Sequence, residues 1–286
     1  MKIIVNSGNI GTPLALELAQ TGHQVTLTVR MPKPNPACDK LGVKQVPFDI
    51  NKPDSMVAAL AGHEAFFSLT PLVENFIAAG TSAILAAKKA GILKIVRSSA
   101  QGAGPAAGIQ LGRWHYAVEK VLEDTGIPFT VLRPPNFMQN YLGFGTPQTI
   151  KSQNAFYSAQ GDGKVSQVDT RDISAVAAHV LVESGHEGKF YDLTGGESFS
   201  NAEAAAVFSR LLGRQIQHVS ISDEQARQAM LGAGTPVWLT NLIVELGMIG
   251  RAGYLAAVKP DVENILKRKP ITFEQFVRDH LPVFRS

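Results

Sequence analysis

A glycine-containing turn near the start of the chain has the residue types that bind phosphate. Residues 5–11 read Val-Asn-Ser-Gly-Asn-Ile-Gly, between a run of β-branched residues and a helical pattern. Gly8 would let the backbone approach a pyrophosphate, Gly11 would let the helix pack against the strand, and the helix amides would face the phosphates. We therefore predict a dinucleotide-binding turn, with a purely structural turn as the alternative. Its contacts would come from Asn6, Ser7, Gly8, Asn9, Ile10 and Gly11.

Asn6 departs from the G-x-G-x-x-G pattern that such turns usually carry, because it stands where the first glycine belongs. Asparagine adopts the left-handed backbone conformation more readily than other residues with a side chain. We therefore expect Asn6 to take the place of the glycine within the turn.

Arg30 is the residue that would select the nucleotide. It ends the second strand pattern, about 20 residues after the glycines, where an NAD-binding turn has an Asp or Glu that binds the ribose hydroxyls. No acidic residue lies near it before Asp39. Because a guanidinium can form paired hydrogen bonds with a 2′-phosphate, NADP(H) is favoured over NAD(H). A solvated arginine is the alternative.

Aromatic and large apolar side chains are concentrated in the second half of the chain, where they could form a pocket for a flat aromatic ligand. Core packing or a subunit interface is the alternative for each of them. The apolar segment from Thr235 to Tyr254 could be a lid or a dimer face. The residues expected to bind the substrate are Trp114, Phe137, Met138, Tyr141 and Trp238.

The elements that would position these residues alternate regularly over the first half of the chain, as in repeated βαβ units. They predict an α/β fold with a Rossmann-type, doubly wound parallel sheet and ligands at the carboxyl ends of its strands. The expected strands are Lys2 to Val5, Gln24 to Arg30, Val43 to Phe48, Ala65 to Leu69, Ile95 to Arg97 and Phe129 to Leu132. The expected helices are Ile10 to Gln20, Pro53 to Ala61, Glu74 to Ala90 and Arg113 to Asp124.

After Pro134 this alternation ends, so we divide the chain into a nucleotide-binding core, 1–134, and a smaller, mostly helical substrate-binding portion, 135–286. Residues from about 164 to 195 are expected to supply the last Rossmann elements, including a strand at Lys189 to Leu193. The pattern from Ala155 to Val168 predicts a β-hairpin around the turn Gly161-Asp162-Gly163. A further strand is expected at Gln215 to Ile221.

The composition excludes several classes of protein. With 45% hydrophobic and 18% charged residues among 286, the chain is too apolar to be disordered, and it has no apolar run that could span a bilayer. A net charge of +3 from scattered basic residues does not favour nucleic-acid binding. The single cysteine, Cys38, excludes an internal disulfide, the histidines show no ligand spacing, and no metal site is expected. The start of the chain has no signal-peptide pattern, so we expect a cytoplasmic location. We also expect a monomer or a homodimer.

Several motifs together resemble the NmrA-like group of atypical short-chain dehydrogenases/reductases, which includes triphenylmethane reductases and NAD(P)H:quinone oxidoreductases. They are residues 7–11 (SGNIG), 68–71 (SLTP), 94–99 (KIVRSS), 125–134 (TGIPFTVLRP), 168–172 (VDTRD) and 188–195 (GKFYDLTG). The resemblance implies that Thr70 and Pro71 border the central part of the cofactor. It also implies that Asp49 and Ile50 lie near the adenine, and that Pro135, Asn136 and Phe137 approach the nicotinamide. Ser98 and Ser99 occupy the place of the dehydrogenase serine.

Tyr116 and Lys120 spell the Y-x-x-x-K pattern of active short-chain dehydrogenases, which makes them candidate catalytic residues. The spacing in related enzymes, counted back from Arg133, instead places His115 at the lysine position and Leu111 at the tyrosine position. On a helical wheel Tyr116 lies opposite the apolar stripe and His115 lies at its border. His115 is therefore the preferred candidate to face the ribose or the substrate.

Without a general acid, a simple ketone is a poor acceptor because it must gain a proton as it is reduced. Conjugated acceptors such as quinones or iminium ions spread or neutralise the charge. The sequence thus predicts an NAD(P)H-dependent oxidoreductase for a small aromatic or conjugated acceptor. The alternative is an NADP-sensing regulator of the NmrA type that binds the dinucleotide without turnover. A non-redox enzyme on the same scaffold is a further alternative.

Overall fold

In the computed structural model of this chain, which describes residues 1–285, the chain divides into two compact units. Unit 1 comprises Met1–Ala106, Gly112–Arg133 and Thr170–Asp192. Unit 2 comprises Ala107–Leu111, Pro134–Asp169 and the chain from Leu193 onward. Each unit is therefore assembled from segments that are distant in the sequence.

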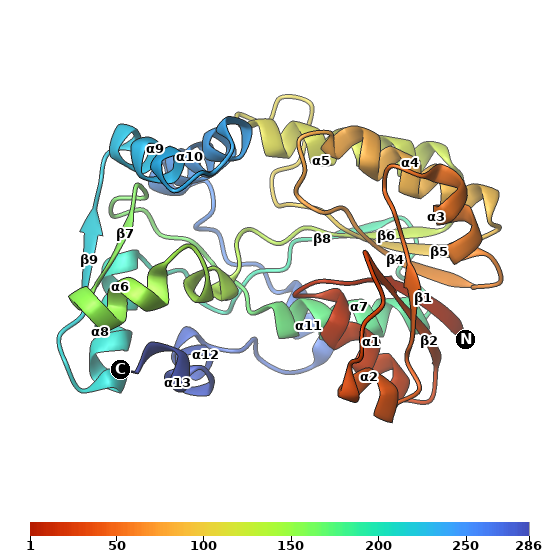
Figure 1. Ribbon diagram of the computed structural model, residues 1–286, viewed down its shortest axis with the longest axis horizontal. Coiled ribbons are helices and arrows are strands. Elements are labelled where there is room, and N and C mark those ends of the chain that lie inside the picture. The colour runs from red at the N-terminus through yellow and green to blue at the C-terminus, as the bar shows by residue number, and fades with distance from the viewer. Residues whose placement is uncertain (286) are drawn as a thin grey trace. The chain divides into compact units, whose positions relative to one another are not determined.

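A seven-stranded parallel sheet forms the centre of unit 1 (Figure 1), with the strand order β3-β2-β1-β4-β5-β6-β8. Its strands are β1 (Lys2–Asn6), β2 (Gln24–Val29), β3 (Lys44–Pro47), β4 (Ala65–Leu69), β5 (Lys94–Ser98), β6 (Phe129–Leu132) and β8 (Lys189–Tyr191). The central strands are apolar on both faces, as a parallel sheet covered by helices on both sides requires. The expected Rossmann-type fold is confirmed, and β8 pairs with β6 as the late strand of this sheet.

Helices cover both faces of this sheet (Figure 1). One side carries α1 (Gly11–Gln20) and α7 (Thr170–Val182), which contact each other. The other side carries α3 (Pro53–Leu60), α4 (Phe76–Lys89) and α5 (Gln110–Asp124), whose apolar side chains form one core with the sheet. A short helix that the sequence analysis did not include, α2 (Pro36–Lys40), begins after Asn35, whose side chain accepts hydrogen bonds from the amides of Ala37 and Cys38.

The strand order reverses at β1, which pairs with β2 on one side and with β4 on the other. Ile3 lies opposite Val25 in β2 and opposite Ala65 in β4. In such sheets the crevice outside the carboxyl ends of these strands is the usual ligand site. The turn after β1 and the loop after β4 both begin at this place.

Unit 2 is mainly helical and has its own apolar core. Its elements are the 3₁₀ helix η1 (Met138–Leu142), the helices α6 (Thr146–Gln153), α8 (Asn201–Leu212), α9 (Asp223–Gly232), α10 (Val237–Arg251), α11 (Asp261–Leu266), α12 (Phe273–Asp279) and α13 (Leu281–Phe284), and the strands β7 (Ala155–Ser158) and β9 (Gln217–Ser220). Ser200 and Ser222 cap α8 and α9 through complete capping boxes. The core includes a cluster of phenylalanine rings around Phe208 and Phe273, which pack edge to face.

The hairpin expected at 155–168 is wrong, because β7 pairs in parallel with β9 from much later in the chain. Beyond Ser158 the loop packs against α10 instead of returning along β7. A Cβ on Gly163 would lie 2.2 Å from the carbonyl oxygen of Gly250, so the two backbones touch there. Val165 then forms a bridge with Phe199. The glycines that suggested a turn are used for this close approach.

Candidate functional site

The turn after β1 has the close backbone contacts that a dinucleotide cradle needs. Gly8 has a φ of +129°, a conformation that favours glycine. A Cβ on Gly11 would lie 1.6 Å from the carbonyl oxygen of Asn6, so only glycine lets α1 begin this close to β1. No side chain caps α1, whose N-cap residue is Ile10. From α7, Ser174 donates a hydrogen bond to the carbonyl of Ile10 at 2.8 Å and holds the turn in place.

Asn6 does not take the role that the sequence suggested. It is the last residue of β1 and is not among the described residues that have a positive φ. Its side-chain Nδ2 donates to Thr28 Oγ1 at 2.8 Å, and its Oδ1 accepts from the amide of Leu69 at 3.1 Å. The physical reason is that a strand end between two other strands needs a side chain that can hydrogen-bond to both. Asn6 therefore fastens β2 and β4 to β1 below the turn, and its side chain is only 7% exposed.

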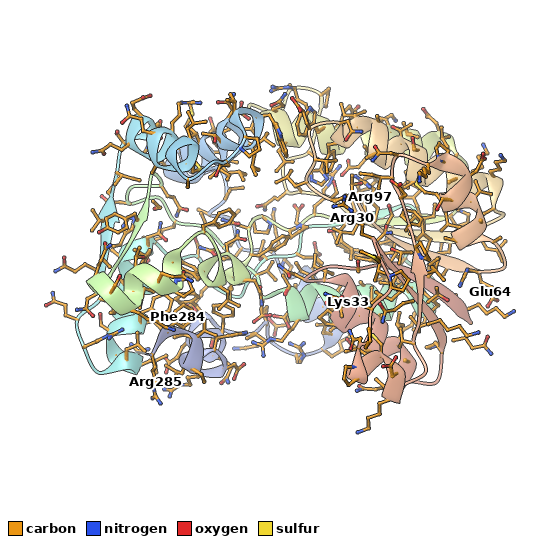
Figure 2. All side chains as sticks on the ribbon, viewed as in Figure 1. Arg30, Lys33, Glu64, Arg97, Phe284 and Arg285 are labelled. Atoms are coloured by element: carbon orange, nitrogen blue, oxygen red, sulfur yellow. The ribbon has the colours of Figure 1, made fainter. Side chains whose placement is uncertain are left out.

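Arg30 directly follows β2 and is exposed, and no hydrogen bond or ion pair joins its side chain to any residue that the structure describes (Figure 2). The neighbouring amide of Ser7 donates to the carbonyl of Thr28, so the end of β2 and the turn are adjacent. Asp49 and Ile50 follow β3 and are partly buried. The Asp49 carboxylate accepts from the amide of Asn51 and lies 3.8 Å from Lys52 Nζ.

Beyond β4 and β5, on the side of the sheet that α4 and α5 cover, lies a cluster of buried polar side chains. Arg97 is fully buried, and its Nη1 donates to Thr70 Oγ1 at 3.0 Å (Arg97 is labelled in Figure 2). Its Nε and Nη2 have no hydrogen-bond partner among the described residues, and neither does Nδ1 of His115. Burial and the nearby charge of Arg97 hold the pKa of His115 well below its usual range. His115 also packs edge-on against Phe76.

A second polar group on the same side is fully satisfied. Glu119 is 1% exposed and accepts hydrogen bonds from Ser99 Oγ at 2.5 Å and from Arg133 Nε and Nη2 at 3.0 and 2.5 Å. The guanidinium of Arg133 lies 4.5 Å from the centre of the Phe190 ring. This group ties together β5, α5, β6 and β8 at the carboxyl edge of the sheet. Glu119 is not among the site residues predicted from the sequence, because on the helical wheel it lies outside the apolar stripe of α5.

Tyr116 and Lys120 lie on the same helix, α5. Both are partly exposed, and Nζ of Lys120 pairs with Oε2 of Glu123 on the same helix. This pairing raises the pKa of Lys120. Trp114 stacks on Phe76 at 5.8 Å between ring centres and joins the core of unit 1. Ser98 is buried at the end of β5, and Pro71 is exposed after Thr70.

Unit 2 contains a cavity of about 590 Å³. Aromatic rings line part of it, from Tyr141, Phe144, Phe156 and Tyr157. Side-chain amides line another part, from Asn136, Asn140, Gln160, Gln167, Asn201 and Gln225. None of the described residues that line it is charged. Such a surface suits a flat, uncharged, conjugated ring system with a few hydrogen-bonding atoms.

The cavity includes some of the residues expected from the sequence and not others. Tyr141 and Asn136 line it, whereas Phe137, Met138 and Trp238 do not. Phe137 forms a bridge with Val168, and Met138 is buried in the core of unit 2. Trp238 is partly exposed near the start of α10, and Pro135 is partly exposed before Asn136. The amides of α8 and α9 were missed because nothing in their local sequence marks a pocket.

No group of three or more His, Cys, Asp or Glu side chains is placed to hold a metal ion within residues 1–285. In the same range, no helix is both long enough and apolar enough to cross a membrane.

Comparisons with known proteins agree with this geometry. The model of the NmrA-like family matches residues 1–277. The NAD(P)H azoreductase of Xenophilus azovorans is 35% identical over 282 residues, which cover 99% of this chain and 98% of that protein. The crystal structure of an NADPH-dependent quinone oxidoreductase from Escherichia coli, complexed with NADPH, superposes with a TM-score of 0.86 at 25% identity, over 98% of this chain and 100% of that one. The triphenylmethane reductase of Citrobacter sp., complexed with NADP(H), has a TM-score of 0.85 at 23% identity over 98% and 99% of the two chains, which shows the shared fold.

Proposed function

Because this chain belongs to the NmrA-like family, we propose that it is an NAD(P)H-dependent reductase of a flat conjugated acceptor, such as a quinone or an azo compound. The observation that carries the proposal is the cavity of unit 2, which combines aromatic walls and amides without a charged residue among those described. A simple ketone would need a proton donor there. A conjugated acceptor needs alignment and exclusion of water.

The residues present fit a dinucleotide. The close approach at Gly11 and the positive φ of Gly8 leave the backbone of the turn open to a pyrophosphate, as in other Rossmann-type units. When bound, the nicotinamide supplies the hydride. The chain's part is to hold the turn through Asn6 and Ser174, to supply a largely apolar cavity and to orient the acceptor by its amides. Burial raises the pKa of Tyr141 in that cavity, so its phenol remains protonated.

The regulatory alternative predicts binding without turnover. It is less well supported, because the azoreductase is 35% identical to this chain over 282 residues. The deciding experiment mixes the purified protein and NADPH with a quinone, an azo dye or a simple ketone, and follows absorbance at 340 nm. We expect oxidation with the quinone or the dye at a rate at least about 100-fold above that with the ketone, which corresponds to the usual contribution of a general acid. Binding of NADPH without oxidation by any acceptor would favour the regulator.

Within this function we propose that Arg30 selects NADPH over NADH. Its exposed side chain, without a partner among the described residues, fits a 2′-phosphate, and hydrogen bonds to charged groups are worth about 1.5–3 kcal/mol. Arg30→Ala should therefore raise the KM for NADPH by about 10- to 100-fold and leave the KM for NADH nearly unchanged. Lys33→Ala is the matched control on the same loop. Equal use of both cofactors by the unchanged protein would refute the assignment.

We propose that Tyr116 and Lys120 are not catalytic, whereas the cluster around His115 contacts the bound cofactor or substrate. Because Lys120 is paired with Glu123, the double variant Tyr116→Phe, Lys120→Met should change kcat by less than about twofold, compared with the 10²- to 10⁴-fold loss expected for a general acid. Steady-state kinetics with a quinone measures this. A loss of 100-fold or more, with an unchanged circular dichroism spectrum, would restore the Tyr–Lys pair as the acid.

A further inference from the structure

A continuous row of hydrogen bonds runs through the wall of the unit 2 cavity. Gln167 Nε2 donates to the Tyr141 hydroxyl at 3.4 Å, and Tyr141 donates to Asn201 Oδ1 at 2.7 Å. Asn201 Nδ2 donates to Ser158 Oγ at 2.8 Å, and Ser158 Oγ lies 2.9 Å from His218 Nε2. The row thus begins at a titratable ring and ends at a cavity-lining amide. The first four of these residues line the cavity, whereas His218 does not.

The cavity end of the row is incomplete. Gln167 is 3% exposed, and its Oε1 has no hydrogen-bond partner among the described residues. Leaving a buried amide oxygen without a donor costs about 1–3 kcal/mol. The backbone of Gln167 lies against that of Gly195, because a Cβ on Gly195 would lie 2.2 Å from the carbonyl oxygen of Gln167. The Gln167 amide therefore has an unused acceptor within the wall of the cavity.

The direction of the row depends on the proton of His218. Each of the two hydroxyls has a single hydrogen, and each amide has a donor end and an acceptor end. Asn201 Nδ2 and the amide of Gln160 both donate to Ser158 Oγ and use its two lone pairs, so the serine hydrogen goes to a bare Nε2 and His218 is neutral. A charged His218 donates to Ser158 instead. The serine then donates to a flipped Asn201, Tyr141 donates to Gln167, and the Gln167 amide presents its N–H groups where its oxygen was. Amide orientations in structures are interchangeable in this way.

We propose that these five side chains form one reversible hydrogen-bond chain, in which the charge of His218 decides whether the cavity wall at Gln167 accepts or donates a hydrogen bond. The inference rests on the proposed function, because it names the acceptor class that the reductase binds. A neutral His218 selects aromatic ligands that carry an N–H or O–H group. A charged His218 selects ligands that carry a carbonyl or another acceptor, as quinones do. The side chains rotate, and no proton crosses the amides.

The surroundings of His218 allow its proton to change. Burial lowers its pKa, and the negative charge of Asp162 opposes this effect. From β7, the ring of Phe156 lies 5.3 Å from the His218 ring. On α8, which also packs on β9, Glu203 pairs with Lys164 and Arg210 pairs with Glu274. Asp162 is thus the charged group that acts on this ring.

The test uses three small aromatic probes and no cofactor. Indole carries one N–H donor, 1-methylindole is its matched control without a donor, and acetophenone carries only an acceptor. Calorimetric titration of the full-length protein at pH 5 and pH 8 should show indole binding at least about threefold more tightly at pH 8, acetophenone more tightly at pH 5, and 1-methylindole with little change. By linkage, indole should lower and acetophenone should raise the pKa of His218, read from its ring ¹⁵N shifts.

Two variants make the outcome decisive. Asn201→Asp replaces the amide by a carboxylate that accepts from both Tyr141 and Ser158, so the row is fixed and the pH preference of indole should disappear. Asp is favourable in the first turn of a helix, where Asn201 lies. His218→Phe removes the titrating group and should have the same effect. Equal pH dependence for indole and 1-methylindole, persistence of the preference in both variants, or no binding of any probe would overturn the proposal. NADPH-dependent turnover is measured separately, so either proposal can fail alone.

Discussion

Replacing Glu119 with alanine is expected to lower the free energy of unfolding by about 3–5 kcal/mol, the usual cost of removing one partner of a buried ion pair. The reason is that Arg133, whose side chain is 23% exposed, would lose its only carboxylate among the described contacts while Ser99 lost its acceptor. Urea denaturation followed by circular dichroism measures the effect. A loss of less than 1 kcal/mol would show that the group does not hold the edge of the sheet.

The same helix supplies the control for this experiment. Glu123 pairs with Lys120, but its side chain is 31% exposed and that of Lys120 is 45% exposed. Exposed pairs contribute only about 0–1 kcal/mol, so Glu123→Ala should be nearly neutral. A comparison of the two variants therefore separates burial from charge. Glu119→Gln should fall between them, because it keeps the volume and some of the hydrogen bonds.

The largest expected loss of cofactor binding follows from Gly11→Ala. The added Cβ would lie 1.6 Å from the carbonyl oxygen and 2.8 Å from the carbonyl carbon of Asn6, and neither backbone atom can move without shifting β1 or α1. We expect the Kd for NADPH to rise by at least about 100-fold and stability to fall by about 3 kcal/mol, at the upper end for overpacking. Fluorescence titration and thermal denaturation measure the two effects.

Gly108→Ala is the control for that substitution, because nothing lies within 4 Å of the added Cβ and its φ does not require glycine. Its NADPH affinity and melting temperature should match those of the unchanged protein. If Gly11→Ala bound NADPH as tightly as Gly108→Ala, the turn after β1 would not be the cofactor cradle.

The sheet was predictable because its strands are short apolar runs between helices. Both the apolar runs and the helical spacing of apolar residues can be recognised within a short stretch of sequence. The close packing of α1 on β1 at Gly11 also follows from the local pattern. Asn6 was placed wrongly because a two-sided clamp depends on Thr28 and Leu69, which lie far along the chain. The hairpin failed for the same reason, since β7 finds its partner in β9.

The candidate site was predictable only in part. The sequence pointed to Tyr141 and to the aromatic residues around it, because aromatic clusters are visible in composition. It could not indicate that Gln167, Asn201 and His218 meet, since separate segments bring them together. Glu119 was missed because a charged residue outside the apolar stripe of a helix is normally expected at the surface, and its partners Ser99 and Arg133 come from other segments of the chain.

The absence of charge among the described residues of the cavity wall has a consequence for dyes that carry sulfonate groups. A sulfonate that entered would lose its hydration and find no cation, so it must remain outside in the solvent while the uncharged ring enters. Occupancy of the cavity will accordingly vary little with ionic strength, in contrast to the attraction that we propose between Arg30 and a 2′-phosphate, which added salt weakens.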